Sequence, residues 1–173
     1  PLSNTSGSKN HPPPQDQFPL IRILGGLANA NACDWAIYTP GQNTLQQTPL
    51  QRQGGYFKLA AKMPAINSTL RITGYGMHLQ RLTWSQAQKT VTGPFVGMGQ
   101  GTCGPYLTRY LVDSISGDSG APVIDEATGA VVAVHSGGDC AGTIGANQGS
   151  AIINPDIQRI LQNPNPPPAG PIT

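Results

Sequence analysis

Short strand-like segments, separated by Gly, Pro or Asn in nearly every gap, recur along most of the chain. This regular spacing predicts an all-β protein with antiparallel strands, because tight turns join antiparallel neighbours. A two-sheet sandwich and a pair of barrels both fit such spacing. The segments that we expect as strands are 18–24, 34–38, 56–59, 70–73, 83–91, 106–112, 121–124, 131–135 and 149–153.

One short helix is predicted near the C-terminal end. Asn154 suits the N-cap, and Pro155 suits the first helical position, where a backbone N–H would have no partner in the helix. Four apolar residues then fall on one face, namely Ile153, Ile157, Ile160 and Leu161. The Pro-rich composition of 1–17 and of 164–173 predicts an irregular N-terminal stretch and an irregular tail.

The charge balance limits the partners that we expect. Only 10% of the residues are charged, and 10 Lys and Arg against 8 Asp and Glu give a formal net charge of +2. This balance is too weak to favour nucleic acid or an anionic membrane surface as a partner. No apolar run approaches the length that spans a membrane. Low charge and many Gly, Asn, Thr and Ser residues are typical of secreted all-β proteins, so we expect a secreted or periplasmic protein.

The densest functional signal is the run Gly117-Asp118-Ser119-Gly120. A nucleophilic serine needs a tight turn flanked by glycine, so that its Oγ projects into a cleft and no side chain blocks the carbonyl. Neighbouring backbone N–H groups, here those of Gly117 and Ser119, must also point together to hold an oxyanion. The structural alternative is an ordinary β-turn, because Asp, Ser and Gly are common turn residues.

The surroundings of this run resemble the trypsin/chymotrypsin-like serine proteases. The strand that begins at Pro122, the turn at Thr128-Gly129 and the run His135-Ser136-Gly137-Gly138 follow in the order of that family's specificity-pocket region. Upstream, Gly74-Tyr75-Gly76 is similar to the family's Gly-Trp-Gly element. Asp34-Trp35-Ala36-Ile37 is similar to the strand that carries the triad aspartate. More closely, the chain looks like secreted bacterial trypsin-like peptidases.

This resemblance, which runs from about residue 18 to 161, implies a chymotrypsin-like fold of two antiparallel β-barrels and a short C-terminal helix. Residues 18–68 would form the remainder of the first barrel and carry the triad aspartate. Residues 69–163 would form the second barrel with the nucleophile, the specificity pocket and the helix. We expect the first barrel to be incomplete.

The resemblance also implies a role for each site residue. Ser119 would attack the peptide bond of a polypeptide substrate, and Asp34 would be the buried carboxylate that orients the histidine. Gly117 and Ser119 would supply the oxyanion-hole N–H groups. The Ser136-Gly137-Gly138 run would hold substrate backbone, with Ser136 also supporting Asp34. Asp118 is expected to stabilise its own turn.

The catalytic histidine of this family has no clear counterpart in the sequence. His11 alone precedes Asp34, but it lies in a Pro-rich stretch instead of following an apolar strand. His78 is expected in a loop. We therefore expect the catalytic histidine on an N-terminal segment of the same precursor, upstream of Pro1. Without that base, the 173-residue chain alone should be nearly inactive.

The three cysteines cannot all pair with one another. Cys103 and Cys140 flank the specificity-pocket region and are candidates for a disulfide. Cys33, which precedes Asp34, is then expected to bond to the upstream segment.

Two features of the specificity pocket predict different preferences for the substrate side chain before the scissile bond, the P1 residue. Asp113, six residues before Ser119, stands where trypsin-like members bind Arg or Lys. His135 with Ser114 instead resembles the glutamyl endopeptidases, which bind an acidic P1 residue. Asp113 and His135 could also pair, which would weaken both preferences. We favour the acidic interpretation.

The main functional alternative is a protease-fold binding module that has lost its histidine. A plain β-sandwich interaction domain is the weakest interpretation, since several motif matches in order would have to be accidental. No cofactor is implied. No metal is implied either, because the acidic residues form no calcium loop and the Cys and His spacing matches no zinc site.

Overall fold

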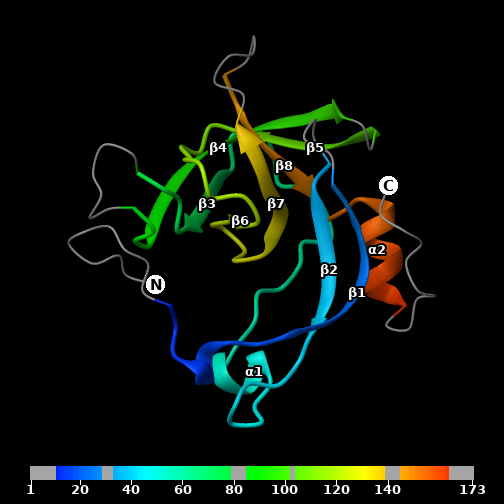
Figure 1. The fold of residues 1–173 in the computed structure, drawn as a ribbon. Coiled ribbons are helices and arrows are strands. Elements are labelled where there is room, and N and C mark those ends of the chain that lie inside the picture. Colours follow the sequence, from blue (N-terminus) through cyan, green and yellow to red (C-terminus); the bar gives the residue numbers. More distant parts are fainter. Residues whose placement is uncertain (1–10, 29–32, 79–84, 102–103, 139–144, 164–173) are drawn as a thin grey trace.

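The computed structural model describes residues 11–28, 33–78, 85–101, 104–138 and 145–163 (Figure 1). Within these ranges the chain is mostly β-structure, which confirms the predicted class. The elements are the 3₁₀ turn η1 (Pro14–Asp16), the helices α1 (Pro49–Gln53) and α2 (Pro155–Gln162), and the strands β1 (Leu20–Leu27), β2 (Trp35–Pro40), β3 (Thr69–Gly74), β4 (Lys89–Gly101), β5 (Gly104–Tyr110), β6 (Pro122–Asp125), β7 (Val131–Gly138) and β8 (Asn147–Ala151).

Six strands close into a barrel in the order β3-β4-β5-β8-β7-β6. All its neighbours pair antiparallel, and β3 closes the barrel by pairing with β6. Alternate side chains of the strands point inward, which is the period expected of a strand with one buried face. The barrel core consists of Leu70, Ile72, Phe95, Tyr110, Val112, Val123, Val132 and Ala133.

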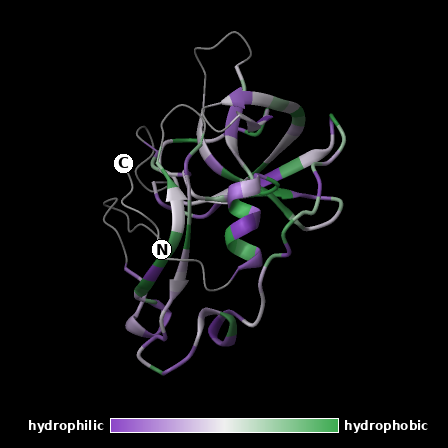
Figure 2. Ribbon diagram, turned by 90° about the vertical axis from the view of Figure 1, so that its right-hand side faces the viewer, coloured by the Kyte–Doolittle hydropathy of each residue, from purple (hydrophilic) through white to green (hydrophobic). Residues whose placement is uncertain are grey.

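The remaining strands, β1 and β2, form a separate antiparallel sheet of two strands. Figure 1 shows this sheet beside the barrel, with α2 next to it. Trp35 of β2 is buried against Ile157 and Ile160 of α2, and partly buried Leu24, Leu27 and Ile37 complete this cluster. The helix carries apolar residues on one side and polar residues on the other (Figure 2), so it covers the sheet with its apolar face.

The predicted C-terminal helix and its N-terminal cap are confirmed. The Asn154 side-chain oxygen accepts a hydrogen bond of 2.9 Å from the backbone N–H of Asp156, and Pro155 begins the helix. Ile157 and Ile160 are buried as expected, but Leu161 is 41% exposed.

Three local predictions need correction. The segment 56–59 forms no strand, and its one ladder contact is an isolated parallel bridge from Leu59 to Val131. The strand expected at 83–91 runs from Lys89 to Gly101, with register shifts where its glycines allow bulges. Helix α1 was not predicted. Thr48 and Gln51 form a capping box at its start, and Gly54 ends it with a φ of 74°.

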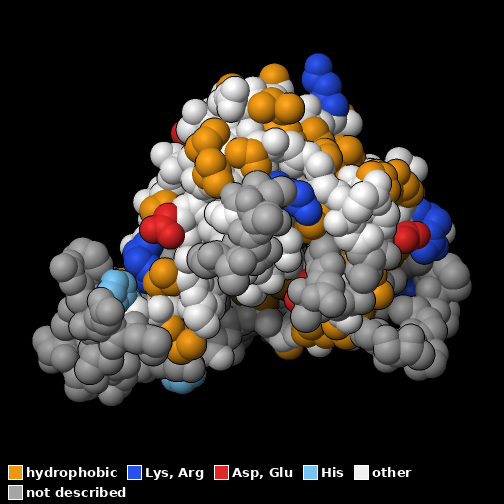
Figure 3. Space-filling view, turned by 90° about the horizontal axis from the view of Figure 1, so that it is seen from above, with side chains coloured by type: hydrophobic (Ala, Val, Ile, Leu, Met, Phe, Trp, Pro, Cys, Tyr) orange, Lys and Arg blue, Asp and Glu red, His pale blue; other side chains and the backbone are white. Residues whose placement is uncertain are grey.

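The surface is poor in charge. Seen from above, apolar side chains cover much of the face and the charged ones are scattered (Figure 3). Within the described ranges, no helix has both the length and the apolar character that crossing a membrane requires.

Candidate active site

The Ser119 turn joins β5 to β6 and is held by backbone hydrogen bonds. Gly117 and Gly120 have φ values of 95° and 88°, which glycine adopts without strain. The N–H of Gly120 donates to the carbonyl of His135 on β7 at 2.7 Å, and the N–H of Ala121 donates to the carbonyl of Asp118 at 3.0 Å. Ser119 itself is exposed. The turn therefore presents the serine to solvent while it fixes the flanking backbone against β7.

Asp118 connects this turn to the Gly-Tyr-Gly element. Its buried carboxylate accepts a hydrogen bond of 2.8 Å from the N–H of Gly76 and one of 3.0 Å from the N–H of Ile115. A β-carbon at Gly76 would lie only 2.7 Å from Oδ1 of Asp118, and one at Gly74 would also overlap it. The two glycines thus allow the carboxylate to approach. Asp118 has the turn-stabilising contacts that the sequence predicted, and the two motifs form one packed unit.

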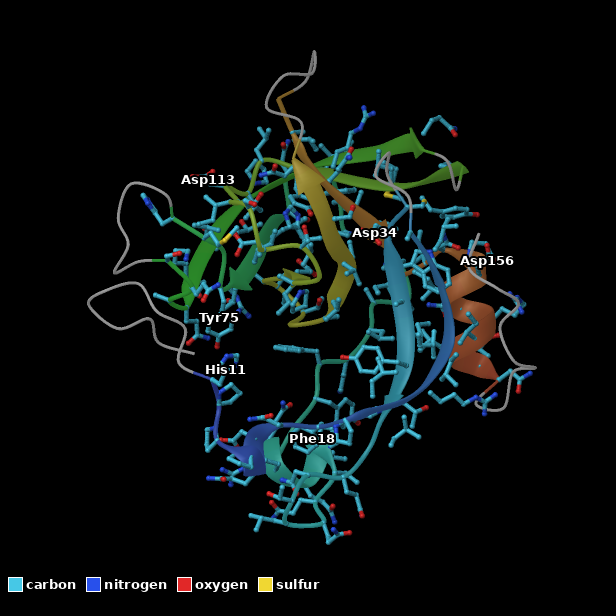
Figure 4. The ribbon with its side chains drawn as sticks, in the orientation of Figure 1. His11, Phe18, Asp34, Tyr75, Asp113 and Asp156 are labelled. Atoms are coloured by element: carbon cyan, nitrogen blue, oxygen red, sulfur yellow. The ribbon has the colours of Figure 1, made fainter. Side chains whose placement is uncertain are left out.

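Asp34 lies at the end of β2 that meets the barrel (Figure 4). The Ser150 hydroxyl on β8 accepts a hydrogen bond of 3.0 Å from the Asp34 N–H and donates one of 3.1 Å to the Asp34 carbonyl. Ser150 pairs with Val134, the residue before His135. Because His135 also bonds the Ser119 turn, these contacts bring the Asp34 backbone and the nucleophile turn to neighbouring strands.

The Asp34 side chain, however, is exposed and not buried as expected. No residue among those described covers its carboxylate or hydrogen-bonds to it. Ser136 also lacks its expected contact with Asp34. The Ser136 hydroxyl oxygen is buried, and it has no hydrogen-bond partner within the described part of the chain.

His135 is buried inside the barrel and contacts Tyr110 of β5. Its Nδ1 lies 2.6 Å from the Tyr110 hydroxyl, which also bonds the carbonyl of Gln148 at 2.8 Å. Burial lowers the pKa of His135 below its ordinary value, and the negative charge of Asp118 and a hydrogen bond with the Gln148 backbone partly oppose this shift. Burial likewise raises the pKa of the Tyr110 hydroxyl. Both side chains are therefore uncharged at neutral pH.

The other predicted pocket residues are more exposed. Asp113 is exposed and lies on the opposite side of the barrel from Asp34 in Figure 4. Ser114 and Gly137 are partly buried, and Gly138 is exposed. The carboxylate whose charge acts on His135 is Asp118, not Asp113. A pairing of Asp113 with His135, the alternative that the sequence left open, is not among the contacts of the described residues.

The remaining histidines lie on the N-terminal stretch and in the loop after the Gly-Tyr-Gly element. His11 lies on the N-terminal stretch, far from Asp34 in the plane of Figure 4. His78 follows the Gly-Tyr-Gly element in a loop, where its N–H contacts the Ser85 hydroxyl at 3.4 Å. Within the described ranges no histidine hydrogen-bonds to Ser119 or to the Asp34 carboxylate.

Cys33 is fully buried and disulfide-bonded. The chain has only two other cysteines, Cys103 and Cys140, and both lie outside the described residues. The bridge that we expected between those two therefore falls outside the described residues and stays a prediction. The expected bond from Cys33 to an upstream segment stays a prediction as well. No cluster of three metal-ligating side chains occurs among the residues that the structure describes.

Sequence reasoning did not identify Tyr110. An aromatic residue in an apolar strand carries no signal for a polar contact, and β8 separates its strand from that of His135. The only signal in the sequence was His135 itself, a polar side chain at the end of the apolar run Val131–Val134.

No family model and no curated protein sequence matches the chain, but solved structures do. A Glu endopeptidase matches 75% of this chain and 54% of its own, with a TM-score of 0.57 and 21% identity. A mutant of human heparin binding protein matches 88% and 69%, with a TM-score of 0.59 and 20% identity. The inactive form of the Rv3671c protease matches 84% and 65%, with a TM-score of 0.53 and 13% identity.

The chain thus has the fold of the trypsin/chymotrypsin-like serine proteases, and the predicted chymotrypsin-like architecture is confirmed. It spans about half the length of the Glu endopeptidase, namely 54%.

Proposed function

We propose that this chain is the nucleophile-bearing part of a secreted serine endopeptidase with a Ser-His-Asp mechanism. The observation that carries the proposal is the Ser119 turn. An exposed serine stands between two left-handed glycines. The Gly120 N–H donates a hydrogen bond to β7, and the Asp118 carboxylate accepts one from the Gly-Tyr-Gly element, so both fix the backbone of the turn. An ordinary β-turn needs no such support from two separate parts of a barrel.

In the proposed reaction, a histidine takes the Ser119 proton while Oγ attacks the scissile carbonyl carbon. The N–H groups of Gly117 and Ser119 would hold the oxyanion, and Asp34 would orient the imidazole. The C–N bond breaks as the histidine returns its proton to the leaving amine. Water, deprotonated by the same histidine, then releases the acyl group from Ser119.

The histidine would come from an upstream segment of the same precursor, and the β1–β2 sheet offers a surface for it. Ile21 of β1 and Tyr38 of β2 are 65% and 53% exposed, which is high for large apolar residues in a sheet. An open groove of about 260 Å³ adjoins β2 and α2, and its lining is mostly apolar. Among the described residues each strand of this sheet has only one partner, so further strands can pair with it.

Active-site labelling tests this proposal. A fluorophosphonate should modify Ser119 in a protein that includes the coding sequence upstream of Pro1, and the 173-residue chain alone should react little. Ser119→Ala is the control for the labelled site. If the longer protein folds and Ser119 stays unlabelled, the protease proposal is wrong.

The second candidate is a binding module of the same fold. It is favoured by the exposed Asp34 carboxylate, which no described histidine contacts, and one similar structure is named for binding heparin. The same labelling experiment separates the two candidates, because a binding module needs no reactive serine.

For the proposed protease we favour an acidic P1 residue. His135 is buried beside the nucleophile turn, whereas Asp113 is exposed. The Glu endopeptidase among the similar structures agrees with this preference. Exchange of His135 for Ala in the longer protein should remove cleavage after Glu, and an unchanged Glu preference would exclude the assignment.

A further inference from the structure

Tyr110 and His135 form a buried polar pair that the acyl-transfer steps do not use. Tyr110 is 0% exposed and His135 is 3% exposed. Their rings are tilted by 51° with centroids 5.9 Å apart, and the hydroxyl lies 2.6 Å from Nδ1. Buried polar groups cost free energy unless they are hydrogen-bonded, so this geometry calls for an explanation.

The strand order of the barrel and a glycine on β8 allow these two side chains to meet. In the strand order β5-β8-β7, the Tyr110 side chain must pass over β8 to reach β7. Gly149 of β8, which pairs with His135, leaves this passage open. A β-carbon there would lie 3.1 Å from the Tyr110 hydroxyl oxygen and also close to the Val134 carbonyl. A larger residue at 149 would therefore overlap the backbone of β7 and crowd the hydroxyl.

Counting protons then determines the form of the imidazole. A tyrosine hydroxyl has one proton, and we assign that of Tyr110 to the Gln148 carbonyl 2.8 Å away, because a carbonyl oxygen can only accept. The Tyr110 oxygen must then accept a hydrogen bond from Nδ1–H of His135. In the neutral ring only one nitrogen carries a proton, so Nε2 is left as an acceptor.

We propose that Tyr110 is a positioning residue that holds the His135 proton on Nδ1, so that Nε2 alone changes protonation and selects the P1 side chain. This rests on the proposed protease function and its acidic P1 pocket. A protonated Nε2 donates to the carboxylate of Glu. A neutral Nε2 instead accepts a hydrogen bond from the carboxamide N–H of Gln. The preferred P1 residue therefore changes from Glu towards Gln as the pH rises.

The groups that face His135 determine where this change occurs. They are the uncharged Tyr110 from β5, the Gln148 carbonyl from β8 and the Asp118 carboxylate from the loop before β6. Burial keeps the free imidazole neutral, and Asp118 favours its charged form. An incoming carboxylate adds a second negative charge, so binding of Glu takes up one proton from solvent.

The tautomer can be tested in the 173-residue chain without any catalysis. We would record ¹⁵N NMR spectra of the histidine side chains and assign His135 by the loss of its signals in His135→Gln. The wild-type protein should show the proton on Nδ1. Tyr110→Phe should lose this bias, whereas Tyr106→Phe, which removes a hydroxyl from the same strand, should keep it. A proton on Nε2 in the wild-type protein, or an unchanged tautomer in a folded Tyr110→Phe variant, would overturn the proposal.

Specificity is then measured on the longer protein that fluorophosphonate labels at Ser119. Above the His135 pKa, kcat/KM for a Glu peptide should fall about tenfold per pH unit relative to the matched Gln peptide. Tyr110→Phe should change this ratio and its pH profile while it leaves Ser119 labelling in place. A Glu-to-Gln ratio that is constant with pH would overturn the selection role. Failure of the protease function itself would instead appear as absent labelling, with the tautomer result unaffected.

Discussion

The six-stranded barrel and the β1–β2 sheet differ in how completely their strands are paired and their apolar side chains are buried. Every barrel strand has two neighbours, and core residues such as Leu70 and Ile72 are 0% and 1% exposed. In the sheet each strand has a single neighbour within the described part of the chain, and Ile21 and Tyr38 are more than half exposed. The barrel therefore completes its own core, whereas the sheet depends on α2 and leaves apolar surface for further packing.

The largest difference in stability between the two regions should appear when one apolar side chain is truncated in each. Leu70→Ala should destabilise the chain by about 3 kcal/mol, because it leaves a cavity in the barrel core. Ile21→Ala should cost less than about 0.5 kcal/mol, since its side chain is largely in solvent already. Urea denaturation of both variants measures the difference. Equal losses would mean that the sheet is packed as tightly as the barrel.

A somewhat smaller loss of stability is expected when the contact between the nucleophile turn and the Gly-Tyr-Gly element is removed. Asp118→Ala leaves the N–H groups of Gly76 and Ile115 without their acceptor and should cost about 2 kcal/mol. It should also abolish Ser119 labelling in the longer protein. Asp113→Ala, which alters an exposed carboxylate, is the matched control and should leave the free energy of unfolding nearly unchanged. Normal labelling in Asp118→Ala would show that the turn holds its shape without the carboxylate.

The cap of α2 tests how far the sheet depends on the helix. Asn154→Ala removes the hydrogen bond to the Asp156 N–H and should cost about 1 kcal/mol. Amide hydrogen exchange should quicken first in α2 and β2, which share the Trp35 cluster, and later in β5. Uniform quickening over the whole chain would show that sheet and barrel unfold as one unit.

The smallest effect is the pH dependence that His135 gives to the barrel. Because burial lowers its pKa in the folded chain, the unfolded chain binds a proton more readily. The free energy of unfolding should fall as the pH drops below the ordinary histidine pKa of about 6.5. The contribution of His135 to the free energy of unfolding is present above that pH and is lost below it. Comparing the denaturation of the wild-type protein and His135→Gln at about pH 8 and about pH 5 separates the contribution of His135 from that of the carboxylates. An identical pH dependence in the two proteins would contradict the shift.

The motifs were readable from the sequence because each is a short run with its own turn chemistry. Gly117-Asp118-Ser119-Gly120 and Gly74-Tyr75-Gly76 were recognised separately. Their direct contact through Asp118 was not predictable, because it depends on how β3 and the β5–β6 loop meet when the barrel closes. Helix α1, in contrast, was predictable from the sequence, because Thr48 and Gln51 form a capping box and Pro49 occupies the first helical position.

The exposure of Asp34 could not be read from its neighbours in sequence. A motif identifies the residue type at a position, but burial depends on what the rest of the molecule lays over it. The Tyr110–His135 pair was missed for a related reason. Strand periodicity says that Tyr110 faces inward, but not which residue it meets across β8.

The Asp118–Gly76 hydrogen bond also has a consequence for the order of events during synthesis. Its two partners are 42 residues apart, so Gly76 is synthesised well before Asp118. The serine turn cannot take its final shape until both loops have docked on a closed barrel. Partly made or misfolded copies would therefore lack the turn geometry on which the proposed nucleophile depends.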